Sequence, residues 1–229
     1  MPLIFWRRRG LVIFVAVNLV VAATVLGIGA YHIQLAARGD WSVAFAPIAP
    51  TLPACFLSLV VLPHIISAES QRARSLVGTD LTAAGLSFFS SAAVLGTASA
   101  AVADWDAAFV VVRNIAGLFG LALLGTALLG PMLGWVAPTA AVFLPAVLLA
   151  DPTQHGPSFF TFVFKAADDS LAAQASVAFV VLGVGAIVVV RCWGRLRPGR
   201  RPARRNRWSE GARELADRGH SKRNVTGAG

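Results

Sequence analysis

The chain has 229 residues, of which 56% are hydrophobic and only 14% are charged. A soluble domain carries roughly a quarter charged residues, so this composition excludes an ordinary water-soluble domain and is typical of a chain solvated by lipid. The net charge of +9 does not indicate nucleic-acid binding, because eleven of the twenty Lys and Arg residues follow Gly194, with three acidic residues among them. A basic tail beside a membrane segment favours contact with anionic lipid headgroups.

Two apolar stretches open the chain, and each approaches the 20 or so residues that a helix needs to cross a bilayer. The first covers about residues 11–31. It is longer than the apolar region of about 7–15 residues in a cleaved signal peptide, so we expect it to be a retained span. The second covers about residues 47–66, and its prolines, Pro50, Pro53 and Pro63, predict a kinked helix.

The third expected span covers about residues 81–103 and is rich in small and hydroxyl-bearing residues. Its hydroxyl side chains have two interpretations, namely close helix packing and a polar path, and packing is the commoner use of such residues. The residues concerned are Ser87, Ser90, Ser91, Thr97 and Ser99.

The chain is almost wholly apolar from Ala107 to Ala150, which is too long for one span and about right for two. Three turn-forming residues mark the break between them: Gly130, Pro131 and Gly134. We therefore expect spans at about 108–129 and 132–150, and a last span at about 171–193. In the fourth span, small residues predict close helix packing: Gly117, Gly120 and Gly125. Residues 158–164 are apolar but too short to span, and we expect them to dip into the membrane interface.

Orientation follows from the positions of Lys and Arg near the span ends. With the N-terminus inside, the cytoplasmic segments hold seventeen basic residues, and the outer segments hold only Arg38 and Lys165. The sequence thus predicts an all-α, polytopic membrane bundle of six spans with both ends in the cytoplasm. Residues 1–10 form a cytoplasmic N-terminus, residues 11–193 the transmembrane domain, and residues 194–229 a basic cytoplasmic tail that we expect to be largely disordered.

Polar residues inside or beside the expected spans are the candidates for function. Arg113 and Asn114 lie near the outer end of the fourth span, where they line either an internal cavity, helix interface or translocation path, or where Arg113 simply reaches the outer headgroups. His64, near the inner end of the second span, is a candidate for a path or an interfacial residue. The inner loop at 67–80 carries three charged residues that either contact a soluble partner or only fix topology: Glu69, Arg72 and Arg74.

Signals for catalysis and for cofactors are missing from the sequence. The chain has no HExxH, GxSxG or phosphate-binding GxxxxGK[ST] motif, and no cysteine–histidine cluster with metal-ligand spacing. Cys55 and Cys192 fall in spans that place them toward opposite membrane faces, so we expect no disulfide. The sequence predicts a protein that is not an enzyme, binds no metal or cofactor, and contacts the lipid bilayer rather than nucleic acid.

The fourth and fifth expected spans carry a local pattern that resembles a known family. The residues that carry it are Arg113-Asn114, Gly117-Leu118, Gly120-Leu121-Ala122-Leu123-Leu124, Leu128-Leu129-Gly130, Trp135 and Pro138. Together with six spans in about 230 residues, this pattern is similar to the permease subunit of type-2 ATP-binding-cassette exporters, in particular the small actinobacterial kind. Arginine outnumbers lysine 18 to 2, which indicates a GC-rich bacterial genome.

The resemblance implies a multi-pass transport protein of the bacterial plasma membrane. A separate ATP-binding-cassette ATPase subunit would supply energy, and two permease subunits, as a homo- or hetero-dimer, would form the path. The loop at 67–80 and the residues before Leu11 would contact the ATPase, and residues 151–170 would form outer re-entrant elements. The chain departs from the family in having only about ten residues before its first span, and in its long basic tail.

The alternative hypothesis is a non-transporting membrane assembly or regulatory protein whose basic tail recruits a partner or anionic lipid. A membrane-embedded enzyme of unrecognised type ranks last.

Overall fold

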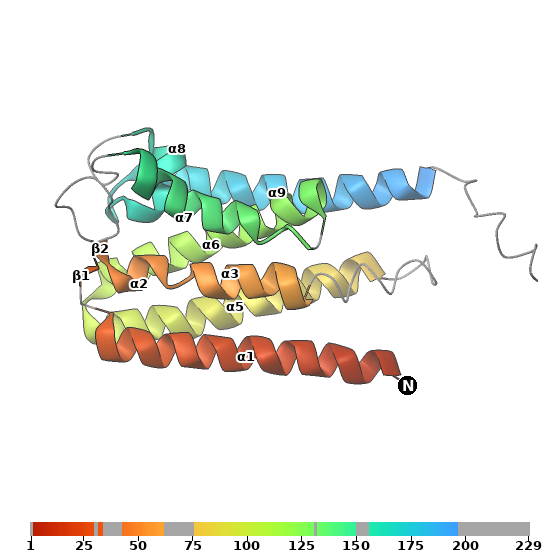
Figure 1. Ribbon diagram of the computed structural model, residues 1–229, viewed down its shortest axis with the longest axis horizontal. Coiled ribbons are helices and arrows are strands. Elements are labelled where there is room, and N and C mark those ends of the chain that lie inside the picture. The colour runs from red at the N-terminus through yellow and green to blue at the C-terminus, as the bar shows by residue number, and fades with distance from the viewer. Residues whose placement is uncertain are drawn as a thin grey trace, which may run out of the picture. The chain divides into compact units, whose positions relative to one another are not determined.

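The computed structural model describes residues 2–29, 32–33, 43–61, 76–130, 132–149 and 156–196. Its long helices are α1 (Pro2–Ile28), α5 (Leu76–Val102), α6 (Trp105–Leu129), α7 (Val136–Leu148) and α9 (Ser170–Leu196) (Figure 1). The short helical elements are α2 (Phe45–Ile48), α3 (Thr51–Phe56), the π-helical η1 (Leu57–Val61), α8 (Ser158–Thr161) and the 3₁₀-helical η2 (Phe162–Phe164). Apart from one antiparallel pair of two-residue strands, β1 (His32–Ile33) and β2 (Val43–Ala44), the described chain has only helical elements, which confirms the predicted all-α class.

Three helical segments are long and apolar enough to cross a membrane: Ala84–Val102, Trp105–Leu129 and Ser170–Val190. Three shorter apolar stretches accompany them in the described chain: Val12–Ile28, Phe45–Leu59 and Val136–Leu148. Each of the six lies where the sequence predicted a span. Spanning length is therefore shown for half of the predicted spans.

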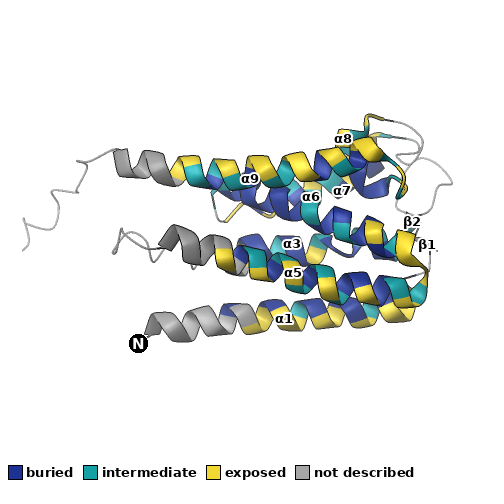
Figure 2. Cartoon of the chain, turned by 180° about the vertical axis from the view of Figure 1, so that it is seen from behind, coloured by how far each residue is buried: buried dark blue, intermediate teal, exposed yellow. Residues whose placement is uncertain are grey.

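Helix α6 is the central helix of the compact unit that ends at Val190. It packs against α5 and α7 along its length and against α2 and α3, while α1 packs on the other side of α5 (Figure 1). In the most apolar 18-residue stretch of each long segment, 67% of the residues are buried in α6, against 33% in α5 and 22% in α9. Figure 2 shows exposed residues along α1, α5 and α9. Many of them are large and apolar, as expected of helices that face lipid.

Glycines let the neighbours of α6 approach its backbone. A Cβ on Gly120 would lie 2.5 Å from the backbone nitrogen of Val180, and a Cβ on Gly117 would lie 2.8 Å from the ring of Phe162. Gly125 similarly faces the turn before α7, where a Cβ would lie 2.7 Å from the carbonyl of Gly134. These contacts confirm the predicted packing role of the three glycines in α6.

The second predicted span, 47–66, is not one continuous helix. The described part breaks between α2 and α3 at Ala49 and Pro50, and it ends in the π-helical η1. Pro50 precedes α3 and Pro53 lies in its first turn, where a missing backbone N–H removes no helical hydrogen bond. The sequence predicted one kinked helix here, whereas the structure has two short helices, with the second beginning at Thr51 after Pro50.

Helix ends follow local capping signals. Helix α6 begins at Trp105, before the predicted start at residue 108, because the carboxylate of Asp104 accepts a hydrogen bond of 2.7 Å from the Ala107 backbone N–H. It ends at Leu129, and Gly130 follows with a positive φ of +84°, which favours glycine, at the break predicted from the sequence. Helix α1 extends back to Pro2, well before the predicted boundary at residue 11. The tail after Leu196 lies outside the described residues.

Candidate functional site

Arg113 and Asn114 form the most polar cluster buried in the described bundle. They lie on α6, eight residues after its start and thus about 12 Å along the helix. Arg113 is 5% exposed and Asn114 is fully buried. The interpretation that Arg113 reaches the outer headgroups is therefore wrong, because α6 begins a full two turns earlier and the side chain is enclosed by protein.

The partners of Arg113 are backbone carbonyls of the segment between α7 and α9. We name residues 156–166, which contain α8 and η2, the α8–η2 segment. The guanidinium donates from Nη2 to the carbonyls of Phe162 (2.8 Å) and Lys165 (2.6 Å), and from Nη1 to that of Ala166 (2.7 Å). Phe162 is the first residue of η2, and Lys165 and Ala166 directly follow its last residue, Phe164.

Asn114 extends the same cluster to a second segment. Its Nδ2 donates to the carbonyl of Val163 in η2 (2.8 Å) and to that of Pro47 in α2 (2.9 Å). Its Oδ1 accepts from Nε and Nη2 of Arg113, each at 3.3 Å. Two adjacent residues of α6 thus hold both α2 and η2, which come from distant parts of the chain.

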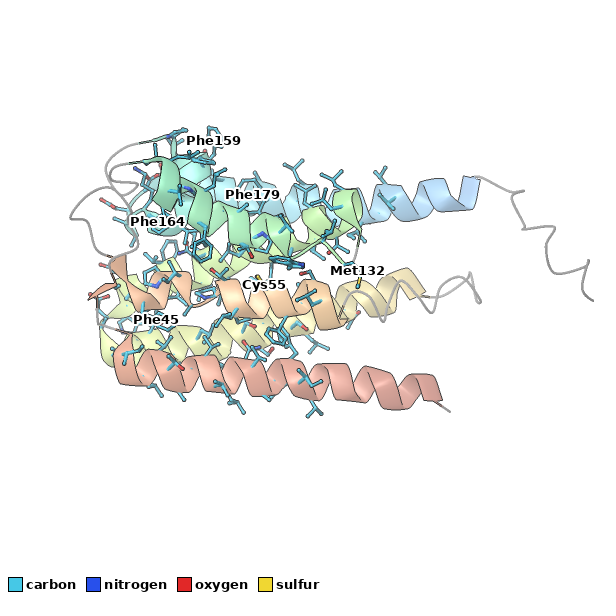
Figure 3. The ribbon with its side chains drawn as sticks, viewed as in Figure 1. Phe45, Cys55, Met132, Phe159, Phe164 and Phe179 are labelled. Atoms are coloured by element: carbon cyan, nitrogen blue, oxygen red, sulfur yellow. The ribbon has the colours of Figure 1, made fainter. Side chains whose placement is uncertain are left out.

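The apolar part of the α8–η2 segment packs into the helix bundle. Phe162, Val163 and Phe164 are all buried. The Phe162 ring packs on Gly117 and lies 5.5 Å from the ring of Phe179 in α9. Phe159 lies on the outward side of the segment, while Phe164 lies on the side toward α2 (Figure 3).

Asp169 joins the α8–η2 segment to α9. Its Oδ1 accepts from the Ala172 backbone N–H (2.9 Å), which caps α9, and its Oδ2 accepts from the Ser158 hydroxyl (3.0 Å). The Ala172 hydrogen bond is the main reason that the pKa of the Asp169 carboxyl is lowered, and the hydrogen bond from Ser158 lowers it further. The carboxylate also acts electrostatically on the Arg113 guanidinium, so it offsets part of the buried positive charge.

The polar groups of Arg113 and Asn114 fix neighbouring segments of the chain in place. The guanidinium and the Asn114 amide are bonded to the chain, and among the described residues no three His, Cys, Asp or Glu side chains come together as metal ligands do. The sequence identified Arg113 and Asn114 but missed their partners, because those partners are backbone carbonyls. Asp169 could have been recognised from its place before an apolar helix.

The other predicted site residues lie outside the described residues: His64, Glu69, Arg72 and Arg74. Cys55 is free; its thiol lies 3.3 Å from Thr139 Oγ1 of α7. No protein-family model, curated protein or solved structure matches the chain.

Proposed function

We propose that the protein is a permease-like subunit of an ATP-driven export system in a bacterial plasma membrane. It crosses the membrane six times with both ends in the cytoplasm, and it works with a separate ATPase subunit and a second permease subunit. In this proposal the three long helices make three of the crossings, and the three shorter apolar stretches make the other three. Aromatic side chains at the two ends of α6 support this placement, since Trp105 is 82% exposed at one end and Trp135 is 37% exposed beyond the other.

The observation that carries the proposal is the α8–η2 segment. An apolar segment before the last helix leaves the surface, buries Phe162–Phe164 among the helices, and is held there by a buried arginine. Backbone that does not form a continuous helix is tolerated inside a membrane only where the protein satisfies its carbonyls, and Arg113 donates to three carbonyls of this segment. A protein that needs only to be anchored in lipid has no use for such an element, whereas the resemblance to exporter permeases implies one at this place in the chain.

The experiment is capture of the ATPase by the tagged, full-length protein in mild detergent. Captured proteins are identified by mass spectrometry, and the complex is assayed for ATP hydrolysis. The proposal predicts an ATPase that is lost in the triple variant Glu69→Ala, Arg72→Ala, Arg74→Ala and retained when residues 195–229 are deleted.

The opposite pattern supports the alternative function. If no ATPase is captured and partner binding depends on residues 195–229, the protein is an assembly or regulatory factor that acts through its basic tail. Loss of the ATPase in both variants would show that neither region alone determines the contact, and charge-neutralising pairs within 67–80 would then be compared one by one.

A further inference from the structure

An apolar cavity lies beside the second half of α6, where residues of η1, α5 and α9 also line it. Its volume is about 170 Å³. Every lining residue is glycine or carries an apolar side chain, so the wall offers no side-chain partner that would hold a water molecule. We name this space the α5–α9 cavity.

The floor of the α5–α9 cavity is buried, whereas its rim is partly open. Phe119 and Leu123 of α6 form the floor and are 3% and 7% exposed. At the rim, Phe88 of α5 and Val180 and Val184 of α9 are only half-buried. The cavity is thus a recess that opens between two helices whose other large exposed side chains are apolar.

Small residues leave this space unfilled. Gly120 and Gly183 bring α9 close to α6, since a Cβ on Gly183 would lie 3.0 Å from the Cβ of Leu123. On its side of the cavity, α5 presents Ala84 and Gly85, and a Cβ on Gly85 would meet no atom within 4 Å. Protein interiors are otherwise close-packed, and atoms that line an empty recess lose contacts on one side. The recess therefore favours an apolar occupant.

The level of the cavity along α6 indicates which apolar groups surround it. Phe119 and Leu123 lie ten and six residues before the end of α6 at Leu129, thus about 15 and 9 Å along the helix. Since a hydrocarbon core is about 30 Å thick, a helix that spans it holds these residues at the level of lipid acyl chains. A cavity of about 150 Å³ accommodates a benzene molecule, so the cavity here has room for several methylene groups.

We infer that the α5–α9 cavity binds the end of an acyl chain of a membrane lipid. The chain enters sideways between α5 and α9, while the rest of the lipid and its headgroup stay in the bilayer. Acyl chains are the solvent of the spanning helices, so by mass action they occupy the recess ahead of scarcer apolar solutes. The site selects for an apolar chain and not for a headgroup, because no charge or hydrogen bond takes part. The inference concerns lipid binding alone and does not depend on the proposed function.

Photolabelling with a lipid tests this inference. The full-length protein is reconstituted in phosphatidylcholine liposomes that contain a phosphatidylcholine with a diazirine at the end of one acyl chain. After irradiation, the labelled residues are mapped by mass spectrometry. Val181 and Leu182, which are 64% and 55% exposed on α9, form the exposed pair and report ordinary contact with lipid. Phe119 and Leu123 form the floor pair, which a chain reaches only by entering the cavity.

Two variants fill the recess from α5. Ala84→Leu and Gly85→Leu each add a larger side chain at a residue that lines the cavity. The matched control is Gly185→Leu on α9, where a Cβ likewise meets nothing within 4 Å but the residue does not line the cavity. Thermal unfolding shows which variants are folded, and only those are compared.

The inference predicts that the floor pair is labelled in the wild type. Its label, relative to that of the exposed pair, should fall at least fivefold in the two filling variants and stay unchanged in the control. A floor pair without label in the wild type overturns the inference, whether the cavity is empty or holds a side chain of another protein, and this result requires no variant to fold. Label that persists in a folded filling variant also overturns it, because lipid then reaches the floor pair by another way.

Discussion

Replacement of Arg113 by alanine should release the α8–η2 segment from the helices. The change deprives three backbone carbonyls of their donor, those of Phe162, Lys165 and Ala166. A buried polar group left without a partner costs about 1–3 kcal/mol, which gives roughly 3–9 kcal/mol for the three. Part of this cost is offset, because the variant no longer buries a guanidinium, whose effective desolvation penalty is several kcal/mol.

We expect a net loss of about 3 kcal/mol, concentrated in the α8–η2 segment rather than spread over the bundle. Since about 1.4 kcal/mol corresponds to a factor of ten, opening of this segment should become on the order of 100-fold more frequent. Hydrogen–deuterium exchange of the purified protein in detergent measures this opening for peptides that cover residues 158–166. Exchange in Arg113→Lys should be intermediate between that of the wild type and that of Arg113→Ala, because an ammonium group lacks the planar fork of donors that lets a guanidinium bond several carbonyls at once.

The control for this prediction is Thr126→Val on the same helix. Thr126 is buried, but its hydroxyl donates only to Ala122 of α6, so exchange in residues 158–166 should stay as in the wild type. If Arg113→Ala also leaves that exchange unchanged, Arg113 does not hold the segment and the geometry has been misinterpreted.

Two further predictions concern α9. Gly120→Leu should separate α6 from α9 and lower the midpoint of thermal unfolding by at least the equivalent of about 1–3 kcal/mol, because its Cβ already meets the Val180 backbone, whereas Gly85→Ala meets nothing within 4 Å and should be tolerated. The pKa of Asp169 is lowered in the folded protein, so its contribution to stability is present above its ordinary pKa and is lost as pH falls through the lowered value. Thermal unfolding is therefore measured from neutral pH to well below the ordinary carboxyl pKa of about 4. Asp169→Asn should lose less stability in acid than the wild type, and an equal loss would contradict the capping role.

Much of the helical framework was predictable because it depends on local signals. Long apolar runs located the helices, and the glycine break at Gly130 separated α6 from α7. The start of α6 was placed three residues late, although Asp104 before Trp105 is a recognisable cap. The break at Pro50 was predicted as a kink, because sequence alone does not show whether the chain continues the helix after a proline or restarts it.

The sequence predicted the side chains of the candidate site but not the groups that they bond. A buried arginine in an apolar helix is a strong signal, and it marked Arg113 and Asn114. Their partners, the carbonyls of Phe162 and Pro47, carry no signal in the sequence, because every residue has a carbonyl and these two lie 49 and 67 residues away along the chain.

Reporter fusions that map membrane topology test the central claim most directly. Full-length protein is tagged at residue 1, residue 70, residue 229 and, for the other side, within residues 34–42 and 151–155, and each tag is probed in intact cells with an impermeant reagent. The account predicts that the first three tags are protected in the cytoplasm and the last two are labelled from outside. Termini on opposite sides of the membrane, or a protein released into the soluble fraction without detergent, would contradict it.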